Sequence, residues 1–70
     1  MKCKILYDTG FISIKTFSDF DDFIVWFTMY RYITKNAIMN NLIVNVIAKL
    51  QLYENDKLIY NAVFNYNDYK

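Results

Sequence analysis

The stretch SDFDDFIVWFTMYRYI, Ser18–Ile33, decides the fold because it is the one long helical segment that the sequence supports. Ser18 is a suitable N-cap, since its hydroxyl can accept a hydrogen bond from a free backbone N–H of the first turn. Asp19, Asp21 and Asp22 then place negative charge at the positive end of the helix dipole. The sequence therefore predicts a helix that begins directly after Ser18.

Apolar side chains occupy both sides of this predicted helix. An advance of about 100° per residue places one set on a single stripe, which we expect to pack on a sheet: Phe20, Phe23, Ile24, Phe27 and Tyr30. The opposite side should be polar, yet it is also largely apolar, with Val25, Met29, Tyr32 and Ile33 on it and Trp26 on its flank. The helix is therefore more apolar than one small core requires.

Composition limits the class of protein. The chain of 70 residues predicts one small α+β domain, 1–70, near the lower size limit for a core without disulfides, metal or a partner. The formal net charge of +1 does not by itself indicate a class of binding partner. No apolar run has the length of a membrane span or the form of a signal peptide, so we expect a cytoplasmic protein that does not act at a membrane.

Two segments before the helix alternate with period two, as strands do: Lys2–Asp8 and Phe11–Phe17. Gly10 tolerates the positive φ of a tight turn, so we expect a two-residue turn that pairs Asp8 with Phe11. This register predicts that one face of the hairpin meets the helix, with Cys3, Ile5, Tyr7, Ile12, Ile14 and Thr16 on it. The other face then carries Lys2, Lys4, Leu6, Phe11, Ser13, Lys15 and Phe17.

The segment LIVNVIAKLQLY, 42–53, fits both a helix and a strand by periodicity. Its β-branched residues favour a strand, and Glu54–Asp56 is typical of a turn before the alternating segment Lys57–Tyr66. We expect a three-residue loop that pairs Leu52 with Leu58.

The predicted fold is therefore a two-layer α+β ββαββ fold, in which one helix covers one face of a four-stranded antiparallel sheet. The alternative is ββααβ, in which residues 37–52 form a second helix. The tail Asn65–Lys70 either frays past the last strand or extends it.

The residue inventory argues against catalysis. Without histidine and with Cys3 as the only cysteine, the sequence offers no zinc cluster and no Cys–His or Ser–His nucleophile pair. Gly10 is the only glycine, which excludes glycine-rich phosphate loops. We assign the acidic first turn to helix capping and Cys3 to the core. The prediction is no enzyme, no cofactor and no metal.

The second apolar side of the helix is the strongest functional signal. Exposed apolar patches on small proteins usually mark contact sites, where Trp, Tyr and Met are over-represented. We predict a partner or dimer interface formed by Val25, Trp26, Met29, Tyr32 and Ile33. The alternative is that Ala37–Met39 or the C-terminal tail folds back and covers this side. A second apolar patch, on the sheet face that the helix does not cover, could also serve as an interface or be covered within the chain. Its residues would be Ile43, Ile47, Ile59 and Val63.

These observations predict a small non-enzymatic interaction protein that binds itself as a homodimer, a larger host protein, or both. Its size and its heavy use of Asn, Lys, Ile, Tyr and Phe, typical of AT-rich coding sequences, suggest a phage or mobile-element inhibitor of a host defence protein in a bacterial cytoplasm.

The alternative is a nucleic-acid-binding module. It would use a sheet face on which lysines contact phosphates and aromatic rings stack on bases: Lys2, Lys4, Phe11, Lys15, Phe17 and Lys49. The low net charge and the presence of a single arginine, Arg31, weigh against this alternative.

Overall fold

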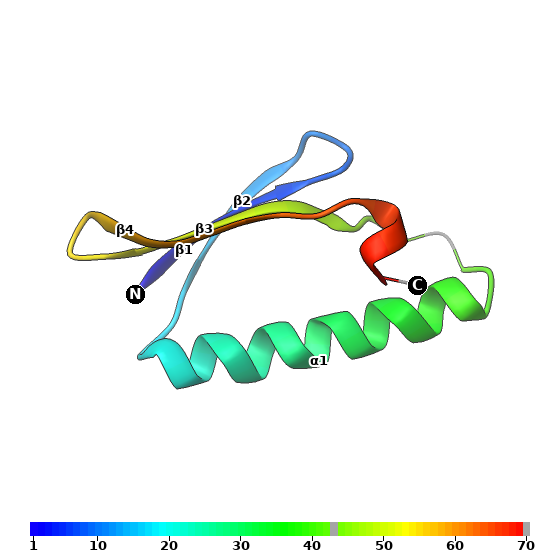
Figure 1. The fold of residues 1–70 in the computed structure, drawn as a ribbon, viewed down its shortest axis with the longest axis horizontal. Helices are drawn as coiled ribbons and strands as arrows, with labels where there is room; N and C mark the ends of the chain where they lie inside the picture. The colour runs from blue at the N-terminus through cyan, green and yellow to red at the C-terminus, as the bar shows by residue number, and fades with distance from the viewer. Residues whose placement is uncertain (43, 70) are drawn as a thin grey trace.

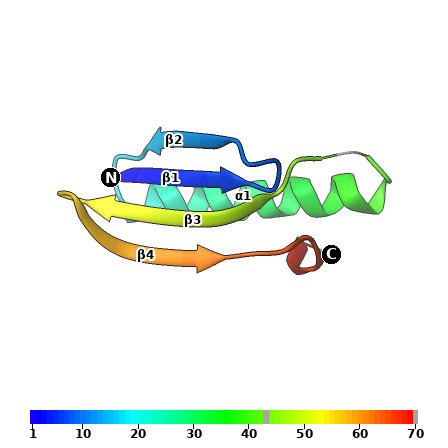
Figure 2. The ribbon, with the colours of Figure 1, turned by 90° about the horizontal axis from the view of Figure 1, so that it is seen from above.

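Four antiparallel strands form one open sheet, and a long helix lies across one face of it, in a computed structural model that describes residues 1–42 and 44–69. The strands are β1 (Lys2–Tyr7), β2 (Ile12–Thr16), β3 (Ile47–Glu54) and β4 (Lys57–Val63), and the helix is α1 (Phe20–Met39). The strand order is β2-β1-β3-β4 (Figure 2). Figure 1 shows the two layers, with α1 below the sheet.

This architecture confirms the predicted ββαββ fold. The ββααβ alternative is wrong, because residues 47–54 form β3 and residues 37–39 belong to the last turn of α1. β3 pairs with both β1 and β4, so Leu50 and Leu52 lie at the centre of the sheet.

The helix begins one residue later than predicted. Asp19 is the N-cap, because its backbone is extended and its carboxylate accepts a hydrogen bond from the backbone N–H of Asp22 at 2.8 Å. The Ser18 hydroxyl instead donates to the Asp22 side chain. The helix also continues past Ile33 to Met39, since no glycine or proline interrupts residues 34–39.

The first hairpin has a three-residue loop rather than the predicted two-residue turn. The backbone N–H of Tyr7 donates to the carbonyl of Phe11 at 2.9 Å, and the N–H of Gly10 donates to the carbonyl of Tyr7 at 3.0 Å. Gly10 has a φ of 89°, which suits the left-handed residue of such a loop. The loop is therefore Asp8–Gly10, and Tyr7 faces Phe11 across it.

The longer loop shifts the register of β2 by one residue. Cys3 pairs with Lys15, and Ile5 pairs with Ser13. Because side chains alternate between the two faces, this shift exchanges the faces of every β2 residue. The predicted faces of β2 are wrong: Ile12, Ile14 and Thr16 point away from α1. The same shift brings Phe17 into the core instead of leaving it on the outer face.

The second hairpin has a two-residue loop, Asn55–Asp56, in which both residues have positive φ (51° and 64°). This is the backbone of a type I′ turn, and it replaces the predicted three-residue loop. A register irregularity follows, so that Leu52 pairs with Tyr60 rather than with Leu58. Beyond the irregularity the shift is two residues, so Leu52 and Tyr60 keep their predicted face. Before it, Leu58 pairs with Tyr53 and lies on the opposite face from the one predicted.

The core lies between the sheet and α1. It consists of Cys3, Ile5, Phe17, Phe23, Phe27, Ile47, Leu50 and Leu52. The helix is rotated from its predicted placement: Phe23 is only 1% exposed, whereas Phe20 and Ile24 are 41% and 42% exposed. The prediction that Phe20 and Ile24 face the core is therefore wrong, and the buried side of α1 instead includes Thr34.

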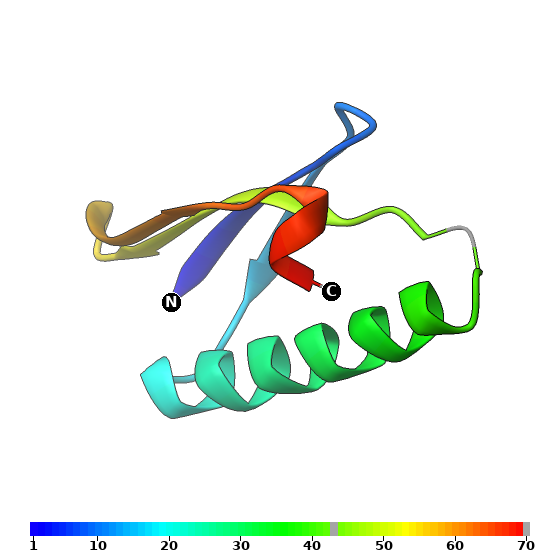
Figure 3. The same cartoon turned by 45° about the vertical axis from the view of Figure 1, so that its right-hand side comes forward.

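The chain after β4 folds back toward the helix. The N–H of Phe64 donates to the carbonyl of Ala48, and a 3-10 helix η1 (Tyr66–Tyr69) follows. Figure 3 shows η1 between the sheet and the second half of α1. The buried hydroxyl of Tyr69 donates to the carbonyl of Ile47 at 2.7 Å, so residues 66–69 neither fray nor extend β4. Lys70 lies outside the described residues.

Candidate interaction surfaces

Four large apolar side chains point away from the sheet along the middle of α1. Val25, Met29, Tyr32 and Ile33 are each 55–66% exposed. Their spacing repeats at helical intervals, so they form one stripe, which we name the outer helix face. In Figure 1 no other segment among residues 1–42 and 44–69 lies on this side of α1.

Trp26 is not part of the outer helix face. Its ring lies 5.3 Å from the Phe17 ring and stacks on Phe27 and Tyr30 at 6.2 and 5.9 Å. It is half-buried against the core, and the ammonium group of Lys15 lies 5.8 Å from its ring. Trp26 therefore packs at the edge of the core, and only four of the five predicted interface residues share one exposed surface.

The two segments that could cover the outer helix face lie elsewhere. Residues 37–39 continue α1 itself, and η1 contacts the side of α1 that faces the sheet, where the Tyr69 ring meets the Tyr30 ring edge-on at 6.1 Å. Together with Arg31 and Lys35, the end of η1 lines a side hollow of about 200 Å³. Within the described residues, Val25 and Met29 stay uncovered.

Opposite charges flank the outer helix face at its two ends. Asp21 and Asp22 lie in the first turn of α1, where they also favour the helix dipole. Arg31 and Lys35 lie in the second half of the same helix. The guanidinium of Arg31 lies over the buried Phe27 ring, away from the outer helix face, and Lys35 lines the side hollow with it. The face is therefore apolar in the middle, with acidic residues at one end and Lys35 on the flank of the other.

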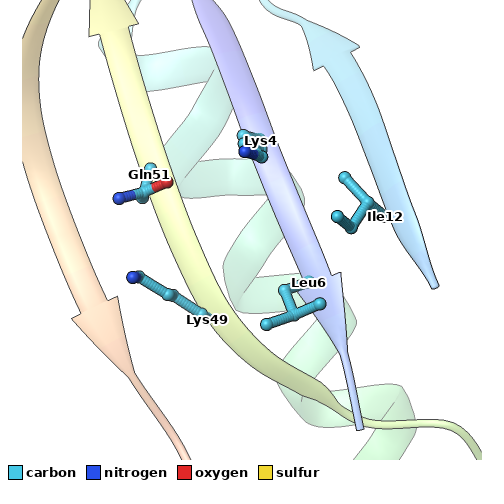
Figure 4. Close-up of a pocket in the computed structure, with 5 residues that line it drawn as sticks. All are labelled: Lys4, Leu6, Ile12, Lys49 and Gln51. Carbon is cyan, nitrogen blue, oxygen red and sulfur yellow. The ribbon is translucent and has the colours of Figure 1, made fainter. Parts of the chain in front are cut away.

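The second exposed surface is the face of the sheet that points away from α1, which we name the outer sheet face. Alternation and pairing place the following residues on it: Lys2, Lys4, Leu6, Ile12, Ile14, Thr16, Lys49, Gln51, Tyr53, Leu58, Asn61 and Val63. A shallow hollow of about 120 Å³ lies on it, lined by Lys4, Leu6, Ile12, Lys49 and Gln51 (Figure 4). In that view the helix is behind the sheet.

The aliphatic residues predicted for the uncovered sheet face differ in their burial. Ile47 is fully buried in the core, so its assignment to an uncovered face is wrong. Ile59 and Val63 are exposed, and Ile43 lies outside the described residues.

The six residues predicted to form a nucleic-acid surface do not share one face. Lys2, Lys4 and Lys49 lie on the outer sheet face. Phe17 is buried, and the ammonium group of Lys15 lies over its ring at 5.6 Å, on the helix side. The Phe11 ring pairs with Tyr7, at 6.0 Å, near the first loop. The one-residue register shift of β2 is the reason for this separation.

Burial raises the pKa of three polar groups in and beside the core. It raises the pKa of the Cys3 thiol to about 11, against a smaller opposing effect of a backbone hydrogen bond. It also raises the pKa of both Tyr30 and Tyr69. The Tyr30 hydroxyl accepts a hydrogen bond from the N–H of Ile47 and lies 3.2 Å from the carbonyl of Asn45. These groups hold the tail and the start of β3 in place.

Among the residues that the structure describes, no three Asp, Glu, Cys or His side chains gather closely enough to bind a metal ion. In the same part of the chain, no helix has the length and apolar character that a bilayer crossing requires. Comparisons with known protein families, curated proteins and solved structures find no match to this chain.

Proposed function

We propose that this protein is a non-enzymatic interaction protein whose outer helix face joins two copies of the chain. The observation that carries this proposal is the exposure of Val25, Met29, Tyr32 and Ile33 beside a core that is already filled by other residues. Exposed apolar side chains in one continuous patch are the usual mark of a protein contact.

Charge favours a second copy of the same chain as the occupant. Asp21 and Lys35 lie equally far from Thr28, on opposite sides of it along α1. An antiparallel pair of α1 helices that cross near Thr28 therefore brings Asp21 of each copy close to Lys35 of the other. Such a pair is two-fold symmetric, as in most homodimers, and it also opposes the two helix dipoles. At 20 residues, α1 is about 30 Å long and presents a whole stripe for this contact.

The biological role that we propose is inhibition. In this proposal a phage or mobile element encodes the chain, and the dimer occupies and blocks a host defence protein in the bacterial cytoplasm. Small size, residue usage typical of AT-rich coding sequences and exposed apolar surface support it. The gene neighbourhood and co-purification from the native host test this role separately from dimerisation.

Molar mass in solution, measured by light scattering, tests the dimer. We expect the wild-type chain to have twice the mass of one copy and Met29→Asp to have the mass of one, with the same far-UV circular dichroism. Val63→Asp is the matched control, because Val63 is 73% exposed but lies on the outer sheet face. A wild-type chain of single mass at high concentration contradicts the proposal, as does a Met29→Asp variant that stays dimeric.

Charge reversal tests the antiparallel arrangement within the same experiment. Asp21→Lys and Lys35→Asp should each weaken the dimer, because each places like charges opposite one another. The double variant restores opposite charges and should recover much of the lost affinity, although Asp21→Lys carries the same dipole penalty in both backgrounds. Equal weakening in the single and double variants contradicts this arrangement.

A further inference from the structure

The outer sheet face carries charge of one sign. Lys2, Lys4 and Lys49 lie on it, and none of its strand positions carries an aspartate or a glutamate. Pairing this face with the same face of a second copy would set lysines against lysines, which is unfavourable. The dimer of the outer helix face therefore leaves the outer sheet face free for a different, acidic partner.

The hollow on this face fits one apolar side chain. Its volume of about 120 Å³ is below the roughly 300–1,000 Å³ of small-molecule pockets. Leu6 and Ile12 supply aliphatic walls, while Lys4 and Lys49 stand beside them on neighbouring strands (Figure 4). An aliphatic group flanked by carboxylates matches both features at once.

The spacing of the lysines matches an extended chain. Lys2 and Lys4 are two residues apart on β1, so their side chains repeat at about 6.8 Å, which is the repeat of alternate side chains on an extended peptide. An acidic and an aliphatic residue two positions apart on an extended segment are one such repeat apart. The carboxylate can therefore lie near the ammonium group of Lys2 while the aliphatic side chain enters the hollow beside Lys4.

We propose that the outer sheet face binds an extended acidic segment of another protein, with one aliphatic side chain seated between Lys4 and Lys49. The surface suits such a segment better than a single-stranded nucleic acid. Base stacking needs exposed aromatic rings, whereas among the described strand residues of this face only Tyr53 is aromatic, and it is half-buried. This inference goes beyond the proposed dimer and does not require it.

Fluorescence anisotropy with a labelled peptide of Glu-Ser-Leu-Ser repeats tests the proposal, because such a strand presents glutamate and leucine alternately on one side. We expect saturable binding that weakens as salt rises, since surface ion pairs are screened. A peptide of Lys-Ser-Leu-Ser repeats should not bind. Single-stranded oligothymidylate is the third probe, and we expect it to bind more weakly than the acidic peptide.

Variants locate the binding site. The double variant Lys4→Glu, Lys49→Glu should weaken binding of the acidic peptide by roughly tenfold or more, and Ile12→Asp should weaken it as well. Lys57→Glu is the charge control. Lys57 is also exposed, but it lies outside the hollow, opposite Glu54 in the strand register beside the second turn. This variant should bind almost as the wild type does, and thermal melting checks that every variant is folded.

Three results would overturn the proposal: no binding of the acidic peptide, equal binding by the double variant, or tighter binding of oligothymidylate. The last result favours a nucleic-acid surface on the same lysines. Met29→Asp separates the two proposals of this protein. Peptide binding that persists in this variant supports an outer sheet face that acts without the dimer. Loss of binding together with the dimer contradicts that independence.

Discussion

Phe23 joins the two layers of the fold through its ring. It is 1% exposed and contacts five other aromatic rings, those of Phe17, Phe20, Trp26, Phe27 and Tyr60. Phe20 is one turn earlier and 41% exposed, so its ring covers Phe23 without being enclosed. Two phenylalanines on neighbouring turns therefore contribute very differently to packing.

Phe23→Ala should unfold the protein, whereas Phe20→Ala should leave it folded. Loss of a buried phenylalanine costs about 3–5 kcal/mol, which is as much as a core of this size usually provides. Phe20 is the matched control because the deleted atoms are the same and only the burial differs. Thermal melting followed by circular dichroism measures both, and equal melting temperatures would show that α1 is rotated from its observed placement.

The 3-10 helix η1 packs against the start of β3 and so holds residues 66–69 in a defined position. Tyr69 is buried, its hydroxyl donates to the carbonyl of Ile47, and its ring contacts Tyr30 and Phe64. Burial raises the pKa of Tyr69, and nearby Tyr30 acts in the same direction. The folded state therefore holds the Tyr69 proton more tightly than the unfolded state does.

Stability should consequently fall in alkali. Below the ordinary tyrosine pKa of 10.0, both states keep the proton and Tyr69 adds no pH dependence. Above that value the unfolded state loses its proton first, so the free energy of unfolding decreases as pH rises. Tyr30 adds to this decrease above the same value, and Cys3 does so from its ordinary pKa of 9.0.

Tyr69→Phe should lower stability at pH 7 by about 1–3 kcal/mol, because the buried carbonyl of Ile47 loses its hydrogen bond. It should also reduce the further loss of stability between pH 9 and 11. Urea unfolding at a series of pH values measures both effects. Tyr66→Phe is the comparison within η1, since Tyr66 is exposed. Parallel pH profiles for wild type and Tyr69→Phe would contradict the assigned role of Tyr69.

At the scale of the whole molecule, two exposed faces with different charge patterns lie on opposite sides of one small core. The outer helix face has Asp21 near one end and Lys35 on the flank of the other, which is the basis of the proposed pairing with a second copy. The outer sheet face is basic along β1 and β3, so it suits an acidic partner. Because a core of this size provides only about 3–5 kcal/mol, association should contribute visibly to stability.

The melting temperature should therefore rise with protein concentration. Association of folded chains stabilises the folded state by mass action, while the unfolded chains do not pair. Met29→Asp should melt at a temperature that does not depend on concentration and that lies below that of the wild type. Calorimetry over a wide concentration range measures this. A wild-type melting temperature that is constant over this range would contradict the dimer.

The amino-acid sequence by itself determined the element types and their order. The acidic first turn and the apolar spacing after it identify α1, and the predicted strand within residues 42–53 corresponds to β3. Of the β-branched residues that favoured a strand, Ile47 lies in β3, whereas Val44 and Val46 precede it. These signals are local, because they depend on caps, propensities and residues within a turn or two of one another. They also sufficed for the burial of Cys3 and for the exposure of the stripe from Val25 to Ile33.

Only the tertiary structure decided which faces meet. A loop of three residues instead of two before Phe11 moved Phe17 and Lys15 to the helix side and Ile12 to the outer side. Gly10 indicates a turn at this position, but a two-residue loop and a three-residue loop both accept a glycine with positive φ. The glycine therefore does not determine the loop length. The rotation of α1 likewise followed from packing on the sheet, which placed Trp26 and Thr34 on the core side in place of Phe20 and Ile24. Register and rotation depend on contacts between distant segments, so they form only when the layers pack together.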